Sequence, residues 1–225
     1  MRGPLRPKPL IILGTGGNCF DILDTVLEIN DRSPAPVYEC VGFLDDAPDR
    51  WGQEFFGVKV LGPLSAAGRF PNAVFVNGIG SERNFWRKDA IIARTGLPPE
   101  RFETIIHPSA SVSRLSALGQ GVVVLQNVTI ASGVKVGDHV IILPNSVLSH
   151  DTVIGDFTCI TGGVCISGNV RVGRCCYLGT NSAVIGNVSI GDYCLVGMGS
   201  VVLRSVESNQ VVVGNPARVL RPTRS

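Results

Sequence analysis

The stretch VLQNVTIASGVKVGDHVIILPNSV, residues 124–147, divides into four blocks of six residues, each of which begins with an aliphatic side chain. The rule extends in both directions without an insertion: every sixth residue from Ile106 to Val202 is Ile, Leu or Val, which makes seventeen blocks. An amphipathic helix repeats near 3.6 residues and a simple strand at 2, so a period of six fits neither. It predicts a short strand and a corner, stacked as a solenoid in which each coil buries its aliphatic residues on the next.

Two further positions of the block are restricted. The fifth residue is always Ala, Ser, Thr, Val or Cys, and glycine often follows the leading aliphatic residue. The alternative is a β-rich sandwich with accidental periodicity. Seventeen blocks in one register argue strongly against it.

Composition excludes several classes of partner. The 225 residues carry 20 basic and 18 acidic side chains, a formal charge of +2, so no overall field attracts nucleic acid or an anionic membrane. No stretch approaches the ~20 apolar residues of a membrane span, and the apolar run 10–13 is too short for the core of a signal peptide. Seven cysteines without a CxxC motif indicate free thiols in a reducing compartment. We expect a cytoplasmic protein.

The first hundred residues follow a different pattern. Residues 10–13 predict a strand, followed by a glycine-rich turn and a helix, while 38–46 and 73–81 predict further strands and 83–96 a second helix. Alternating strands and helices favour a three-layer sandwich around a parallel sheet. Ligands bind beyond the carboxyl ends of such strands. The residues expected to gather there are Gly16, Gly17, Asp45, Asp46 and Gly80. The alternative is that these glycines only form turns and that the acids are solvated.

The block pattern [ILV]-G-x-x-[STAV]-x resembles that of the hexapeptide-repeat acyltransferases. This resemblance implies a left-handed parallel β-helix with three blocks per coil, hence between five and six coils. With GTGG (14–17), VGFLDD (41–46), IIHPSASVS (105–113) and QVVVGNPARVLR (210–221), nearly the whole chain resembles one subfamily of sugar acetyltransferases. These enzymes acetylate nucleotide-linked 4-amino sugars or, in the O-acetylating relatives, sialic acid.

The resemblance implies two domains. Residues 1–104 would form a Rossmann-like domain that binds the nucleotide-sugar, and residues 105–225 a left-handed β-helix acyltransferase domain with a C-terminal tail. The implied sugar-nucleotide contacts are Gly16, Gly17, Asn18, Asp45, Asp46 and Gly80. Two positions depart from the family: many relatives have histidine in place of Asn18 and glycine in place of Cys19.

One histidine lies in a distinctive column of the repeat. Residues 18 apart fall on the same side of neighbouring coils, and the column through His150 contains Ser132, His150, Gly168, Gly186 and Arg204. Two glycines beside a histidine predict a shallow trough that suits an extended pantetheine arm. Histidine titrates near neutral pH, which suits a general base for an attacking amine.

The family motif assigns roles around this histidine. The resemblance implies that His150 is the general base, that Asp151 orients its imidazole, and that the backbone N–H of Gly168 stabilises the oxyanion. Adjacent side chains of a flat strand point to opposite faces. The side chains of His150 and Asp151 can therefore meet only if the backbone turns a corner at residues 149–151.

Acetyl-CoA contacts are implied by the resemblance, and Arg204 is added from the column. The cofactor-binding residues expected are Cys159, Gly168, Thr180, Met198, Arg204, Pro216, Ala217 and Arg218. Cys159 replaces a histidine of the family, which puts that contact in doubt. Because the cofactor cleft of such proteins lies between two prisms, a homotrimer with sites shared between subunits is implied. His107 is expected to be structural and His139 exposed. The three histidines fall in different columns, so no metal site is predicted.

The leading hypothesis is an acetyl-CoA-dependent N-acetyltransferase that acts on the C4 amine of a nucleotide-linked amino-deoxy sugar in surface-glycan biosynthesis. One alternative is O-acetylation of sialic acid or a related sugar. A second alternative is a non-catalytic, sugar-binding trimer. The sequence leaves open the nucleotide, uridine or guanosine, and the stereochemistry of the sugar.

Overall fold

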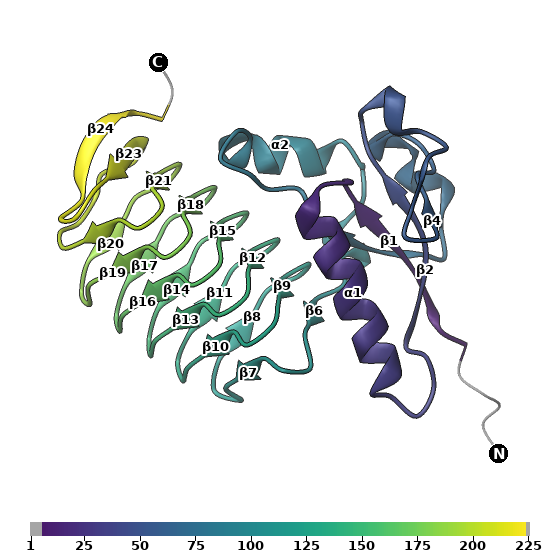
Figure 1. The fold of residues 1–225 in the computed structure, drawn as a ribbon, viewed down its shortest axis with the longest axis horizontal. Coiled ribbons are helices and arrows are strands. Elements are labelled where there is room, and N and C mark those ends of the chain that lie inside the picture. The colour runs from purple at the N-terminus through teal and green to yellow at the C-terminus, as the bar shows by residue number, and fades with distance from the viewer. Residues whose placement is uncertain (1–5, 224–225) are drawn as a thin grey trace.

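The six-residue period builds a parallel β-solenoid with three faces in the computed structural model, which describes residues 6–223 (Figure 1). Nearly every strand is two residues long and pairs with the strand 18 residues away, as Thr129 pairs with Val147. Face 1 consists of β6 (Ile105–Ile106), β9 (Val123–Val124), β12 (Ile141–Ile142), β15 (Cys159–Ile160), β18 (Tyr177–Leu178), β21 (Leu195–Val196) and β23 (Gln210–Val213), with β24 (Arg218–Pro222) antiparallel at its end.

On the other two faces every strand is two residues long. Face 2 consists of β7 (Ser111–Val112), β10 (Thr129–Ile130), β13 (Val147–Leu148), β16 (Cys165–Ile166), β19 (Ala183–Val184) and β22 (Val201–Val202). Face 3 consists of β8 (Ala117–Leu118), β11 (Lys135–Val136), β14 (Val153–Ile154), β17 (Arg171–Val172) and β20 (Ser189–Ile190).

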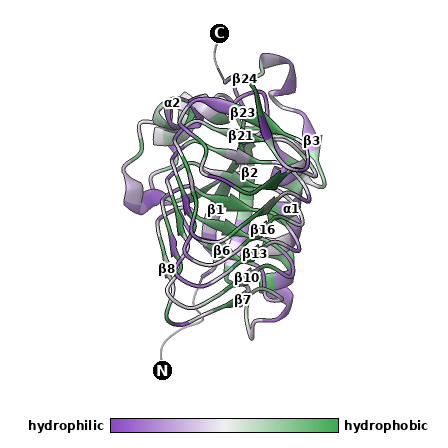
Figure 2. Ribbon diagram, turned by 90° about the vertical axis from the view of Figure 1, so that its left-hand side faces the viewer, coloured by the Kyte–Doolittle hydropathy of each residue, from purple (hydrophilic) through white to green (hydrophobic). Residues whose placement is uncertain are grey.

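The predicted solenoid is confirmed, and the leading aliphatic residues fill its interior. From Val124 to Val202 these residues are at most 5% exposed, and the fifth-position residues pack between them, as Val128 and Val164 do. Figure 2 shows the hydrophobic strands stacked one behind another along the solenoid. Only the first coil is less complete, since Ile106 is 37% exposed.

The fourth residue of each block forms the corner. From Gly121 to Gly199 every sixth residue has a positive φ, which glycine and asparagine tolerate best. Most of these positions are indeed Gly, Asn or Asp. The exceptions are the bulky residues His139, Phe157, Cys175 and Tyr193, which are 18 apart and therefore share the corner between faces 3 and 1.

The N-terminal region contains a parallel sheet in the order β2–β1–β5, from β1 (Lys8–Leu13), β2 (Tyr38–Leu44) and β5 (Val74–Asn77). α1 (Gly17–Asp31) packs on one side of it, in an apolar cluster that also includes Val123 and Ile141 of the solenoid. The short helices η2 (Leu64–Arg69) and α2 (Lys88–Ala93) pack on the other side. The remaining elements are η1 (Pro48–Arg50), β3 (Glu54–Phe55), β4 (Val58–Lys59), η3 (Phe85–Arg87) and η4 (Pro99–Arg101).

Several polar contacts join this region to the solenoid. His107 Nε2 lies 2.6 Å from Glu28 Oε2, and Arg174 Nη2 lies 2.9 Å from Asp89 Oδ2. Lys88 is fully buried, and its Nζ donates to the carbonyl of His139 at 2.6 Å. Burial lowers the pKa of Lys88. His107 is thus the structural residue at the junction that the sequence predicts. No helix within residues 6–223 has the length and apolar content needed to cross a membrane.

The expectation that His139 is exposed is wrong. Its imidazole is 6% exposed, because the corner between faces 3 and 1 is covered by the N-terminal region. The ring stacks on Phe157 at 5.1 Å and meets the edge of Phe102 at 4.5 Å. Burial, with the nearby Lys88 ammonium, lowers the pKa of His139 to about 4.

This burial predicts a pH-dependent stability. Between pH 6.5 and about 4 the unfolded histidine binds a proton that the folded one does not, so stability falls as pH falls through this window. A shift of this size is worth about 3 kcal/mol. Urea unfolding at pH 7.5 and 4.5 should show this loss for the wild type and a smaller loss for His139→Phe. Phe157 adopts the same positive φ, so phenylalanine fits the corner. An identical pH response in both proteins would contradict the assignment.

Candidate functional site

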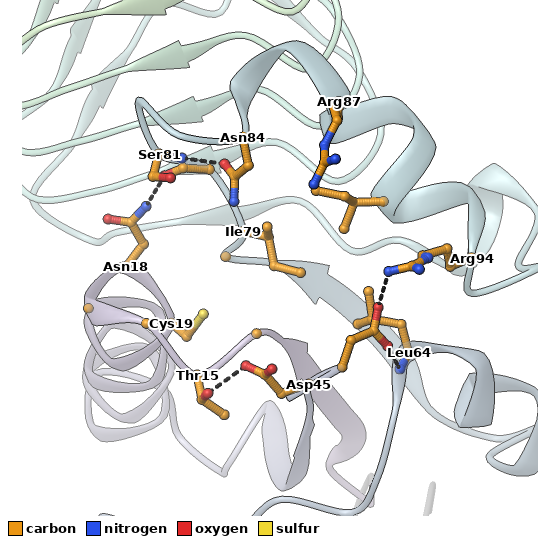
Figure 3. Close-up of a pocket in the computed structure, with 17 residues that line it drawn as sticks. Thr15, Asn18, Cys19, Asp45, Leu64, Ile79, Ser81, Asn84, Arg87 and Arg94 are labelled. Atoms are coloured by element: carbon orange, nitrogen blue, oxygen red, sulfur yellow. Dashed lines mark hydrogen bonds and ion pairs between the residues drawn. The ribbon is translucent and has the colours of Figure 1, made fainter. Parts of the chain in front are cut away.

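A cavity of about 490 Å³ opens at the carboxyl ends of β1, β2 and β5 (Figure 3). All six residues predicted to contact a nucleotide-sugar line it: Gly16, Gly17, Asn18, Asp45, Asp46 and Gly80. Sequence reasoning missed several polar residues of its wall, which come from the loop after β5, from η3 and from the end of α2: Ser81, Asn84, Arg87 and Arg94.

The glycine turn exposes the start of α1. Gly16 is the N-cap residue and Gly17 the first residue of the helix, and a Cβ on either would meet no atom within 4 Å. The first backbone N–H groups of a helix have no partner within it. Bare amides thus face the cavity, as an anionic ligand requires.

The two acids differ in their partners. Asp45 accepts from Thr15 Oγ1 at 2.5 Å and from the backbone N–H of Ala47 at 2.9 Å. Asp46 forms an ion pair with Arg94, with Nη1 to Oδ2 2.6 Å, and accepts from the backbone N–H of Leu64. Asp46 therefore ties β2 to α2 and η2 in addition to lining the cavity.

Cys159 does not lie where an accessible cofactor contact was expected. It is 3% exposed in β15, and its Sγ lies 3.6 Å from Lys88 Nζ. A Cβ on Gly80 would overlap this sulfur, so the thiol is covered by the loop that lines the cavity. Asn18 Nδ2 donates to the carbonyl of Gly80 at 3.1 Å and holds that loop in place. The thiol is thus part of the packed floor behind the cavity.

His150 and Asp151 form the expected pair. His150 Nδ1 lies 3.0 Å from Asp151 Oδ2, and both side chains are more than half exposed. Asp151 has φ 59°, so the corner required at residues 149–151 is present. The imidazole lies over Gly168, where a Cβ would overlap Nε2 and Cε1. Within residues 6–223 no hydrogen bond engages the backbone N–H of Gly168.

Apart from Cys159 and the C-terminal residues, the expected cofactor residues lie at two corners of the solenoid. Gly168 and Arg204 share the corner between faces 2 and 3 with His150, and Arg204 lines a groove of about 260 Å³ with Ala217 and Arg218. Pro216 follows a cis peptide bond in the turn between β23 and β24. Thr180 and Met198 lie at the corner between faces 1 and 2, in a groove of about 460 Å³ that Glu82 also lines.

Comparisons with known proteins identify the repeat and the fold. The model of the bacterial transferase hexapeptide family (six repeats) matches residues 116–150 and 169–204. No curated protein sequence matches the chain. The acetyltransferase domain of PglB from Neisseria gonorrhoeae FA1090 superposes with a TM-score of 0.82 at 25% identity, over 95% of this chain and 100% of that one. The PerB structure from Caulobacter crescentus, in complex with CoA and GDP-perosamine, gives 0.80 at 27% identity, over 95% and 97%. The chain thus contains the bacterial transferase hexapeptide repeat and superposes on these acetyltransferase structures over nearly its whole length.

WeeI from Acinetobacter baumannii AYE shares the fold of this chain, with a TM-score of 0.79 at 22% identity over 94% of this chain and 99% of that one. Within residues 6–223 no three His, Cys, Asp or Glu side chains gather in a way that could hold a metal.

The position of Gly168 beneath His150 allows a direct test of whether the reactive centre lies there. Gly168→Ala places a methyl group where the imidazole lies, at a backbone position without positive φ. We expect the imidazole to move and kcat to fall on the order of tenfold or more, while the melting temperature stays near that of the wild type. Gly68→Ala is the matched control, since a Cβ there meets nothing within 4 Å. Unchanged kcat in Gly168→Ala would argue against a reactive centre beside His150.

Proposed function

We propose that the chain is an acetyl-CoA-dependent N-acetyltransferase that acts on the C4 amine of a nucleotide-linked amino-deoxy sugar in surface-glycan biosynthesis. The observation that carries the proposal is the His150–Asp151 pair over Gly168, since it combines a proton acceptor with an open backbone N–H. The similar PglB domain has been solved with acetyl coenzyme A and PerB with CoA and GDP-perosamine, which supports both substrates.

The chemistry is a direct transfer. Acetyl-CoA supplies the acetyl group as a thioester. As the sugar amine attacks the thioester carbonyl, His150 accepts the amine proton and the N–H of Gly168 donates to the developing oxyanion. Collapse forms the amide and breaks the C–S bond, and the protonated His150 returns its proton to the leaving sulfur, so that CoA departs as the thiol. Asp151 orients the imidazole through Nδ1, which leaves Nε2 toward the substrate.

The cysteines near the site do not suit a covalent intermediate. Cys159 is covered, and burial raises the pKa of Cys19 to about 12, so that this thiol stays protonated. A nucleophilic cysteine needs the opposite, an accessible thiolate. All seven cysteines are free, which supports the proposed cytoplasmic location.

Residues 1–104 would serve as the Rossmann-like nucleotide-sugar domain, with residues 105–225 as the acyltransferase domain. This division is supported by the cavity within residues 1–104, which is lined by the glycine turn, Asp45 and the Gly80 loop. The cavity, however, adjoins face 1, where Gly80 packs on Cys159. His150 lies at the corner between faces 2 and 3, which is the corner opposite face 1. One chain therefore does not bring the two together.

A homotrimer resolves this separation by placing His150 of one subunit beside the cavity of the next. The outward residues of face 2 support the contact, because none is charged, whereas face 3 carries Lys135 and Arg171. The face 2 residues are Ser111, Thr129, Val147, Cys165, Ala183 and Val201. Face 2 also lies between the two corners that hold the expected cofactor residues, so neighbouring prisms packed through it would bring those corners together.

Thiol release from acetyl-CoA tests the function. The acceptors are uridine- and guanosine-linked 4-amino sugars and free sialic acid. Turnover with one nucleotide-linked amine, and none with the matched 4-hydroxy sugar nucleotide, is the expected result. Turnover only with sialic acid would replace the proposal by O-acetylation, and binding without turnover would favour a non-catalytic trimer.

A further inference from the structure

The cavity beside α1 changes in chemical character along its length (Figure 3). Asp45 and Asp46 lie at one end, near Leu64 and Arg94. Neutral hydrogen-bonding side chains, Asn18, Ser81 and Asn84, lie at the other. Arg87 reaches over the cavity from η3, between Asn84 and Arg94.

The two arginines of the cavity are not equivalent. Arg94 is held by Asp46 at 2.6 Å, so its charge is already balanced. Within the described part of the chain, no hydrogen bond or ion pair engages the guanidinium of Arg87. Arg87 is exposed and lines the cavity, and because a guanidinium carries a permanent charge and a fork of donors, it can bind an anion that enters there.

The size of the cavity and the start of α1 specify that anion. The helix directs unpartnered backbone N–H groups at Gly17 and Asn18 into the same space. A cavity of about 490 Å³ that has carboxylates at one end and amides at the other has room for much more than a single phosphate. A diphosphate flanked by two uncharged groups would fill it.

We propose that Arg87 binds the diphosphate of the nucleotide-sugar and thereby fixes its direction in the cavity. The nucleoside lies over Asp45 and Asp46, whose oxygens accept from hydroxyl and ring N–H groups. The sugar lies at the end formed by Asn18, Ser81 and Asn84. Asn84 Oδ1 accepts from the backbone N–H of Ser81, which leaves its amide donors for sugar oxygens. This inference rests on the proposed function.

The direction agrees with the position of the expected cofactor residues Thr180 and Met198. The sugar end adjoins Gly80, and the same loop continues to Glu82, which lines the groove of Thr180 and Met198. The reverse direction would place the sugar beside the Asp46–Arg94 ion pair, on the side of the cavity away from this loop. Only the first direction presents a sugar amine toward the expected cofactor residues.

Calorimetric titration with nucleoside, nucleoside monophosphate and nucleoside diphosphate, in both the uridine and the guanosine series, tests the role of Arg87. Arg87→Gln should weaken binding of the nucleoside diphosphate on the order of 10- to 100-fold. The affinity for the monophosphate should fall less, and that for the nucleoside less than about twofold. Arg87→Lys should recover part of the loss. The matched control is Arg83→Gln, since Arg83 is exposed and pairs only with its neighbour Glu82.

The outcomes separate the two proposals. Equal weakening of nucleoside and diphosphate, or no weakening, would overturn the role of Arg87 while leaving a nucleotide site in place. A wild-type protein that binds neither nucleoside diphosphate would overturn the proposed function as well. Asn84→Ala tests the direction: it should raise KM for the nucleotide-sugar severalfold yet leave the diphosphate affinity unchanged, and weaker diphosphate binding would contradict the direction.

Discussion

His150→Ala should lower kcat for acetyl transfer by a hundredfold or more, with little change in the affinity for the nucleotide. A positioned general base contributes on the order of 10²- to 10⁴-fold. The side chain is 59% exposed and makes one hydrogen bond, to Asp151, so its removal leaves no buried cavity or unpaired group. Steady-state kinetics and thermal unfolding, measured on the same preparation, separate a catalytic loss from an unfolding one.

Asp151→Asn is the companion variant, because asparagine tolerates the φ of 59° that this corner requires. The asparagine amide still reaches His150 but carries no charge, so we expect a smaller decrease in kcat, on the order of tenfold. Asp151→Ala combines the same chemical loss with a strained corner and should also lower stability. If His150→Ala retains wild-type turnover, the base lies elsewhere and the proposed mechanism is wrong.

The solenoid could be predicted from sequence because its chemistry repeats. Each block places an aliphatic residue inside, and a single inserted or deleted residue would shift the register of every later coil. The six-residue period is therefore preserved in the sequence and can be read without the structure. The corner also repeats in the sequence: Asn127, Asn145 and Asn181 occupy the fourth position, which requires a positive φ.

The burial of His139 follows from the side chains at the fourth position of successive coils, which the six-residue period alone does not reveal. Residues 139, 157, 175 and 193 are His, Phe, Cys and Tyr where the other corners have Gly, Asn or Asp. Large residues in an unfavourable conformation at one corner indicate that something covers it. The covering element is the region around α2, through Asp89 and Lys88.

The cavity was only partly predictable. Its glycines and acids follow strands and could be located from the alternating pattern. Asn84 precedes η3 as its N-cap and Arg87 is the last residue of η3, a short helix after β5 whose direction no periodicity specifies. Residue spacing also does not predict where the cavity lies relative to His150, because that position depends on which face of the solenoid the N-terminal region covers.

If the protein forms the proposed homotrimer, mixed trimers should regain activity that neither variant has alone. One variant is His150→Ala. The other is Gly16→Phe, which fills the cavity at a position with an ordinary φ of −87° and open space around a Cβ. Each homotrimer has three defective sites. If each site combines the cavity of one subunit with His150 of the next, every trimer with both chains has one intact site, so about one third of wild-type activity is expected.

The experiment uses two affinity tags, one on each variant, and purification through both, so that only mixed trimers are assayed. Recovery near one third requires sites shared between subunits, because no single chain carries both an open cavity and a histidine. Activity that stays at the level of the parent variants would mean that cavity and base act within one chain. The position of His150 opposite face 1 makes that outcome incompatible with this structure, so the N-terminal region would have to dock differently.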